Sequence, residues 1–264
     1  MNQEKSIEYK GVKVVYDDIG AGSCFVLVHG YLETRQIWDD FADRLSSTFR
    51  VITIDLPGHG ASGTWGKKHT MDDLARSIRA IIVSEGIEKI FLVGHSMGGY
   101  VTMAFADLFP ESLKGYCLFH STCFADTEEK KKNRDREISL VLCKRKKQII
   151  NVNIPKGFAD DNQERMKEEI DRVRKLALMN KEDGIVAILN GMKERPDRTN
   201  VLRKSSLPLL LIGGMKDNYI PVEVFEKLVT IAPHAKILRL QNSGHSGFLE
   251  EPDASEDALV RMLK

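Results

Sequence analysis

Short apolar runs alternate with amphipathic helical segments along this chain, and that alternation restricts the possible fold more than any other feature. The expected strands cover residues 24–28, 50–55, 89–94 and 115–120, and later 207–214 and 235–240. Helical spacing of apolar residues covers 34–47, 70–86 and 97–108, and later 222–232 and a segment from 253. Repeated strand–helix units predict an α/β fold with a mostly parallel central sheet and helices on both faces.

Turn and cap residues support these boundaries. The segment 6–18 alternates apolar and polar residues around Lys10-Gly11, which predicts an additional β-hairpin at the start of the chain. Thr34 and Thr70 stand where N-caps of the first two long helices are expected.

Residues 121–204 interrupt the alternation with long polar helices and no strand pattern. This segment holds 21 Lys and Arg against 15 Asp and Glu, a net charge of +6, whereas the whole chain carries +1. We therefore expect two parts: a core domain formed by 1–120 and 205–264, and a helical cap formed by 121–204. Most of the cap's charge is expected on a solvated outer face.

Composition excludes several classes of protein. A formal net charge of +1 gives no reason to expect binding to nucleic acid or to a membrane surface. No stretch approaches the roughly 20 apolar residues of a membrane-spanning helix, and the first residues lack the apolar segment of a secretory signal. The four cysteines have no metal-like spacing and are expected to be reduced, which favours a cytoplasmic location. A monomer is the default expectation.

The segment GHSMGG, residues 94–99, places a serine between glycines directly after an expected strand and before an expected helix. A sharp strand-to-helix turn leaves no room for side chains beside the serine, so Gly94 and Gly98 fit such a turn. The Ser96 hydroxyl would project beside a helix N-terminus, where unpaired N–H groups stabilise negative charge. A serine in an ordinary tight turn is the plainer alternative, but this setting favours a nucleophile.

Several motifs in a fixed order resemble the α/β-hydrolase fold family over nearly the whole chain. They are VLVHGY (26–31), IDLPGHGAS (54–62), GHSMGG, LLLIGGMKD (209–217) and NSGHSGFLEEPD (242–253). The resemblance implies a Ser-His-Asp mechanism with no metal or organic cofactor. It implies little about the substrate.

A serine nucleophile needs a base that is held by a third group. His245 is the expected base and Asp217 the expected acid, in the family order Ser, Asp, His. Some relatives carry the acid after the preceding strand, which would point near Asp126. For Asp126 and Thr127, however, the cap of the first insertion helix is the preferred interpretation.

Backbone N–H groups of Tyr31 and Met97 are expected to form the oxyanion hole. The side chains of Tyr31 and His120 are the expected substrate contacts, with simple packing as the alternative for His120. The other histidines have plainer interpretations. His95 is expected to be structural, His29 and His59 to bond local backbone, and His69 and His234 to lie at the surface.

The predicted function is hydrolysis of a small carboxylic ester, thioester or lactone through an acyl-enzyme. The serine argues against relatives of this fold that use an aspartate nucleophile. Three alternatives stay open: carbon–carbon bond hydrolysis, cofactor-free haloperoxidase chemistry with the same triad, and a small-molecule sensor with slow turnover.

Overall fold

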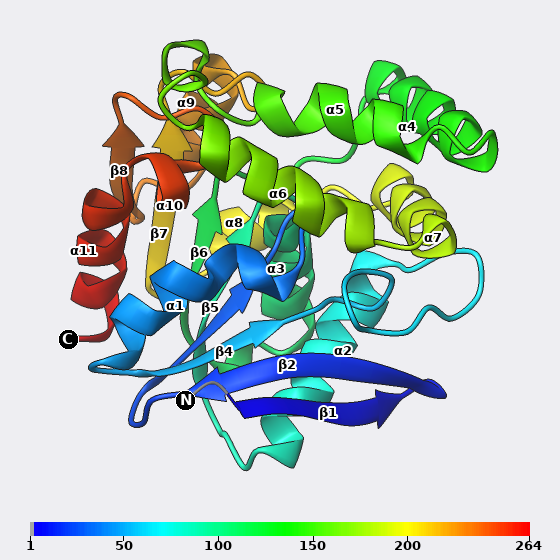
Figure 1. Cartoon of the computed structure of the whole chain (residues 1–264). Helices are drawn as coiled ribbons and strands as arrows, with labels where there is room; N and C mark the ends of the chain where they lie inside the picture. Colours follow the sequence, from blue (N-terminus) through cyan, green and yellow to red (C-terminus); the bar gives the residue numbers. More distant parts are fainter. Residues whose placement is uncertain (1–2) are drawn as a thin grey trace.

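The computed structural model describes residues 3–264 and contains a sheet of eight strands (Figure 1). The strands are β1 (Gln3–Tyr9), β2 (Val12–Ile19), β3 (Cys24–Val28), β4 (Arg50–Ile54), β5 (Ile90–His95), β6 (Leu113–Phe119), β7 (Leu209–Gly214) and β8 (Lys236–Leu240). Their order is β1-β2-β4-β3-β5-β6-β7-β8. The pairs β1–β2 and β2–β4 are antiparallel, and all other pairs are parallel. The mostly parallel α/β sheet predicted from the sequence is therefore confirmed.

The predicted hairpin forms the antiparallel edge of this sheet. Strands β1 and β2 pair from Gln3–Asp18 to Tyr9–Val12. Lys10 and Gly11 between them both have positive φ, 51° and 74°. Two successive residues with positive φ match the twist of a tight two-residue hairpin turn.

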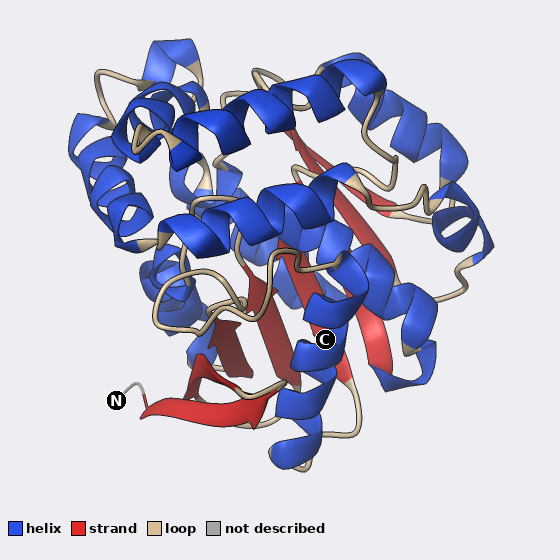
Figure 2. Ribbon diagram, turned by 90° about the vertical axis from the view of Figure 1, so that its right-hand side faces the viewer, coloured by secondary structure: helices blue, strands red, loops and turns tan. Residues whose placement is uncertain are grey.

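Helices cover both faces of the sheet (Figures 1 and 2). In the core part they are α1 (Asp39–Ser46), α2 (Met71–Ser84), α3 (Met97–Leu108), α9 (Val222–Ile231), α10 (Gly247–Glu250) and α11 (Pro252–Leu263). Helix α1 packs with α11, whereas α2 packs with α3 on the other face. The Thr70 side chain caps α2 by accepting the Asp73 N–H at 3.1 Å, as predicted. Thr34 makes no side-chain cap and precedes a short 3-10 helix instead.

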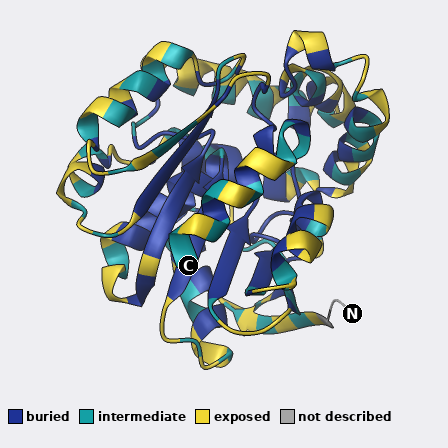
Figure 3. Cartoon of the chain, turned by 90° about the vertical axis from the view of Figure 1, so that its left-hand side faces the viewer, coloured by how far each residue is buried: buried dark blue, intermediate teal, exposed yellow. Residues whose placement is uncertain are grey.

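Burial follows the layers (Figure 3). Strands β3, β5 and β7 are buried at every residue, as expected for strands covered on both faces. The central strands also contribute aromatic rings, such as Phe25 and Phe91, whose centroids lie 5.4 Å apart at an interplanar angle of 69°. A tightly packed sheet of this kind gives the loops at its carboxyl edge a rigid base.

The segment between β6 and β7 is helical, with no strand. Its helices are α4 (Glu128–Leu142), α5 (Lys146–Lys156), α6 (Lys167–Met179), α7 (Glu182–Lys193) and α8 (Thr199–Lys204). Helix α4 packs on α7 and α5 packs on α6, above the carboxyl ends of the strands (Figure 1). The division into a core domain and a cap at 121–204 stays a prediction.

The cysteines are all free. Cys24, Cys117 and Cys123 are buried, whereas Cys143 is exposed at the end of α4. Within residues 3–264, we find no helix that combines the length and the apolar character needed to cross a membrane.

Candidate active site

Ser96 lies at the turn between β5 and α3 with a strained backbone, φ 50° and ψ −114°. Positive φ is uncommon and costly for a residue with a side chain, and strained residues of this kind cluster at functional sites. The glycines are sterically required, because a Cβ at Gly94 would collide with the Gly98 carbonyl and a Cβ at Gly98 with the Val28 carbonyl. The Ser121 hydroxyl donates to the Ser96 carbonyl at 2.6 Å and fixes the turn from β6.

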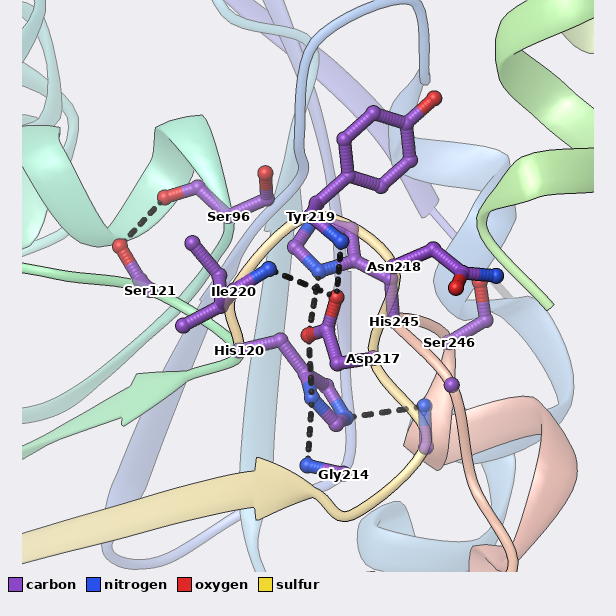
Figure 4. A network of polar contacts seen from close by, with 12 residues as sticks. Ser96, His120, Ser121, Gly214, Asp217, Asn218, Tyr219, Ile220, His245 and Ser246 are labelled. Atoms are coloured by element: carbon purple, nitrogen blue, oxygen red, sulfur yellow. Dashed lines mark hydrogen bonds and ion pairs between the residues drawn. The ribbon is translucent and has the colours of Figure 1, made fainter. Parts of the chain in front are cut away.

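Asp217 and His245 form a direct contact, although 28 residues separate them. His245 Nδ1 lies 2.8 Å from Asp217 Oδ2, and the two side chains are 9% and 1% exposed. The other carboxylate oxygen, Oδ1, accepts the N–H groups of Tyr219 at 2.7 Å and Ile220 at 2.9 Å (Figure 4). Asp217 is thus fixed on both oxygens and in turn orients His245.

His245 and Ser96 line the same cavity. Within residues 3–264 no hydrogen bond joins the two side chains, a common situation before substrate is bound. The ring of His245 lies 5.0 Å from that of His95, the residue directly before Ser96. The three predicted residues Ser96, Asp217 and His245 are therefore brought to one edge of the sheet.

His120 lies beneath this pair and does not line the cavity, so the predicted substrate contact does not fit its position. Its Nδ1 is 3.3 Å from Asp217 Oδ2 and 3.1 Å from the Gly214 N–H, and its Nε2 accepts the Gly247 N–H at 3.1 Å. Burial lowers the pKa of His120 to about 4 despite the nearby carboxylate. The ring is therefore neutral at pH 7. It holds Asp217 from the side opposite the cavity.

The charge on Asp217 is strongly favoured. Burial alone would raise its pKa, but His245 and His120 hold it well below the usual range. A permanent carboxylate here stabilises an imidazolium at His245.

Glu33 and His95 form a second buried pair that connects three loops. Glu33 Oε2 accepts the Gly30 N–H at 2.5 Å and lies 3.0 Å from His95 Nδ1. His95 Nε2 lies 2.8 Å from the backbone carbonyl of His245. Both ring nitrogens face oxygen acceptors, so the favoured state is a doubly protonated ring beside a carboxylate. Burial alone would lower the pKa of His95, but Glu33 raises it above the ordinary value.

Two residues that line the cavity with Ser96 have backbone N–H groups without a partner in the described part of the chain. Met97 is the first residue of α3, and Tyr31 lies in the loop after β3. Neither N–H forms a hydrogen bond with another residue of the described range 3–264. The neighbouring Leu32 N–H is used, because it donates to His59 Nε2 at 3.3 Å.

The cavity has a volume of about 620 Å³, within the range of small-molecule pockets. The core part contributes residues such as Tyr31, Met97 and Tyr219 to its wall. The insertion contributes residues of α4, α5, α6 and α7 together with Gly157 and Phe158. The Tyr31 hydroxyl is buried and has no hydrogen-bond partner in the described part of the chain. Burial raises the pKa of Tyr31 well above its ordinary value. The hydroxyl therefore stays protonated and can donate to a ligand.

The insertion also holds the loop that carries His245. The His245 N–H donates to the Gly157 carbonyl at 2.7 Å. Glu250 accepts four donors from both sides: Ala159 N–H, Asn162 Nδ2, Gly244 N–H and Ser246 N–H, at 2.8, 2.7, 2.9 and 3.3 Å. No sequence pattern indicates Glu250, Glu33 or this connection.

Among the described residues, the group that could hold a metal ion is His120, Asp217 and His245, whose ligand atoms lie within 4.8 Å of one another. In the structure the carboxylate of Asp217 already contacts both imidazole rings. A bound ion would displace those contacts, so metal binding and orientation of His245 would compete.

Two further expectations need correction. His69 is fully buried rather than at the surface, with Nδ1 2.9 Å from the Pro57 carbonyl. The expected cap of α4 at Asp126 and Thr127 is confirmed for Thr127, which accepts the Lys130 N–H at 3.2 Å, but Asp126 takes no part in it. Asp126 instead forms buried ion pairs with Arg134 and Arg195.

Comparisons with known proteins agree with this architecture. Residues 24–252 match the family model described as alpha/beta hydrolase fold. A solved thermophilic esterase from Thermogutta terrifontis superposes with a TM-score of 0.94 at 30% identity, over 99% of this chain and 98% of that one. A pimeloyl-[acyl-carrier protein] methyl ester esterase from Yersinia enterocolitica is 27% identical over 94% of this chain and 97% of its own length.

One relative is longer than this chain. The dihydrolipoyllysine-residue acetyltransferase component of an acetoin cleaving system from Pseudomonas putida is 27% identical over 92% of this chain, but the match spans only 64% of that protein.

Proposed function

The chain belongs to the α/β-hydrolase fold family, and from this membership we propose that it is a serine hydrolase that cleaves a small carboxylic ester. The ester-hydrolase class follows from the esterases to which the chain is similar along nearly its whole length. The substrate and the roles of individual residues are our proposal. The observation that carries it is the buried contact of Asp217 with His245, which lines the same cavity as Ser96.

In the proposed mechanism, His245 Nε2 takes the proton of the Ser96 hydroxyl as its oxygen attacks the ester carbonyl carbon. The negative charge that develops on the carbonyl oxygen is accepted by the N–H groups of Tyr31 and Met97. His245 then protonates the departing alcohol, which leaves an acyl group on Ser96. Water deprotonated by His245 attacks this acyl group and releases the acid.

Asp217 holds His245 with its proton on Nδ1, so that Nε2 faces the substrate and can accept a proton. The carboxylate also stabilises the imidazolium formed in each half-reaction. We further propose that residues 121–204 act as a cap over the cavity and select the acyl group, because α4 to α7 contribute side chains to its wall.

Labelling with a fluorophosphonate followed by peptide mass spectrometry tests the nucleophile. We expect modification of Ser96 alone, and no labelling in Ser96→Ala. Turnover of short esters is measured in parallel, because the sensor alternative predicts one labelling event with persistently slow release. Modification at another residue, or equal ester turnover by Ser96→Ala, would refute the proposal.

A further inference from the structure

The exposed part of the cavity wall carries positive charge only. Its exposed lining residues are Lys130, Asn133, Arg136, Gln148, Val152, Lys156 and Asn218. Most of them belong to α4 and α5, which stand over the sheet edge (Figure 1). Three are cations and none is a carboxylate. A cleft lined by charge of one sign attracts ligands of the opposite sign, even where water screens each charge.

Arg134 supplies a further cation deeper in the wall. Its Nε and Nη2 both bind the carboxylate of Asp126, and Asp126 Oδ1 also accepts Arg195 Nη1 at 2.7 Å. One buried carboxylate therefore serves two guanidinium groups. Arg195 does not line the cavity: its guanidinium stacks on the Tyr100 ring at 3.7 Å, and its Nε and Nη1 donate to backbone carbonyls.

Among the residues that the structure describes, Arg134 has hydrogen-bond partners on Nε and Nη2 only. Its Nη1 forms no hydrogen bond with any residue of the described range, and the side chain lines the cavity. Asp126 fixes the Nε edge of the guanidinium plane, which leaves the opposite edge for another planar acceptor. A carboxylate matches that edge with two parallel hydrogen bonds.

The carboxylates of the wall offset only part of this charge. Glu33 is paired with His95. Glu137 accepts Asn153 Nδ2 at 3.0 Å, and it is the other acidic residue of the lining. The wall thus holds four cations, which are Lys130, Arg134, Arg136 and Lys156. Apart from Glu33 it holds one carboxylate, Glu137, which forms no ion pair among the described residues.

We propose that this wall is an anion subsite, and that the substrate is an ester whose acyl chain ends in a second, free carboxylate. Arg134 binds that carboxylate, and Lys130, Arg136 and Lys156 attract it to the cavity. This inference rests on the proposed ester hydrolysis and narrows its substrate class.

The test compares two methyl esters of equal chain length, monomethyl adipate and methyl hexanoate, which differ only in the terminal carboxylate. We expect a kcat/KM for the anionic ester at least about tenfold above that for the neutral ester, and a fall with added salt. Arg134→Gln should remove most of this preference by raising the KM for monomethyl adipate. The triple variant K130Q/R136Q/K156Q should reduce the preference and its salt dependence.

A matched triple variant, K132Q/K147Q/K175Q, removes the same charge from exposed positions of the insertion that do not line the cavity. It should retain the preference. Equal kcat/KM for the two esters, or equal losses in both triple variants, would overturn the anion subsite.

Binding to Ser96→Ala by calorimetry separates this inference from the proposed function. Tighter binding of monomethyl adipate than of methyl hexanoate supports the subsite even if neither ester is turned over. Turnover of both esters without any preference refutes the subsite and leaves ester hydrolysis intact.

Discussion

One carboxylate oxygen of Asp217, Oδ2, contacts both His245 and His120, and the geometry of the site therefore depends on Asp217. Asp217→Asn keeps the size of the side chain but presents an amide, and it favours the wrong tautomer of His245. We expect kcat to fall roughly 10³- to 10⁴-fold, with little change in KM. Steady-state kinetics on a short neutral ester measures this loss.

Asp126→Asn is the control, because Asp126 is the alternative acid. It should lower the melting temperature through the buried ion pairs with Arg134 and Arg195, while kcat for the neutral ester changes far less than in Asp217→Asn. The reverse pattern, with Asp126 essential and Asp217 dispensable, would show that the acid is misassigned.

The Glu33–His95 pair predicts a pH dependence. Glu33 raises the folded-state pKa of His95, so the stabilisation is complete below the unfolded pKa and is lost as pH rises through the folded one. Deprotonated His95 can no longer donate to both Glu33 and the His245 carbonyl. Glu33→Gln keeps an acceptor for the Gly30 N–H but lowers the pKa of His95.

We therefore expect the alkaline loss of kcat/KM and of thermal stability to begin at lower pH in Glu33→Gln than in the wild-type protein. Activity profiles and melting curves across the same pH series measure both. If the alkaline loss of kcat/KM begins at the same pH in both proteins, the protonation of His95 does not control the activity.

At the scale of elements, the turn between β5 and α3 depends on close backbone packing against β3. A Cβ at Gly98 would meet the Val28 carbonyl and also lie 2.8 Å from the His29 carbonyl. Gly98→Ala should destabilise the fold by about 1–3 kcal/mol and displace Ser96, with a large loss of kcat. Gly66→Ala is the control, since its Cβ meets open space and only its φ of 57° is strained. It should cost roughly 1 kcal/mol and leave kcat unchanged.

The elements that could be predicted from the sequence are those whose signals are local. Continuous apolar runs identified the buried strands, and the glycines around Ser96 identified the turn that presents it. Asp217 and His245 followed from the order of motifs. The Glu33–His95–His245 connection could not be predicted, because it joins residues 62 and 150 positions apart through the packing of three loops. His120 was misplaced because a residue at the end of a strand can face either the cavity or the layer beneath it.

At the scale of the whole molecule, the insertion and the core meet at the loop that carries His245. The Gly157 carbonyl accepts the His245 N–H, and Asn162 Nδ2 donates to the Asn242 carbonyl at 2.7 Å. Deletion of 121–204 would therefore remove supports of the His245 loop as well as part of the cavity wall. Point variants are needed to separate the two effects.

Glu250 offers that separation, because one oxygen accepts donors from the insertion and the other accepts donors from the His245 loop. In Glu250→Gln, an amide NH₂ must replace one of these oxygens and face N–H donors, which leaves buried donors unpaired at about 1–3 kcal/mol. We expect kcat to fall at least about tenfold, with faster hydrogen exchange at Gly244 and Ser246.

Asn162→Ala removes one side-chain donor from Glu250 and the donor to the Asn242 carbonyl, but it leaves the contacts of Glu250 with Gly244 and Ser246 in place. It should therefore reduce kcat less than Glu250→Gln, and hydrogen exchange should rise mainly within residues 157–163. Equal effects of the two variants on kcat and on exchange in the His245 loop would mean that Glu250 supports the fold in general. A larger effect of Glu250→Gln confined to that loop would mean that the insertion and His245, the proposed base, are mechanically coupled through this carboxylate.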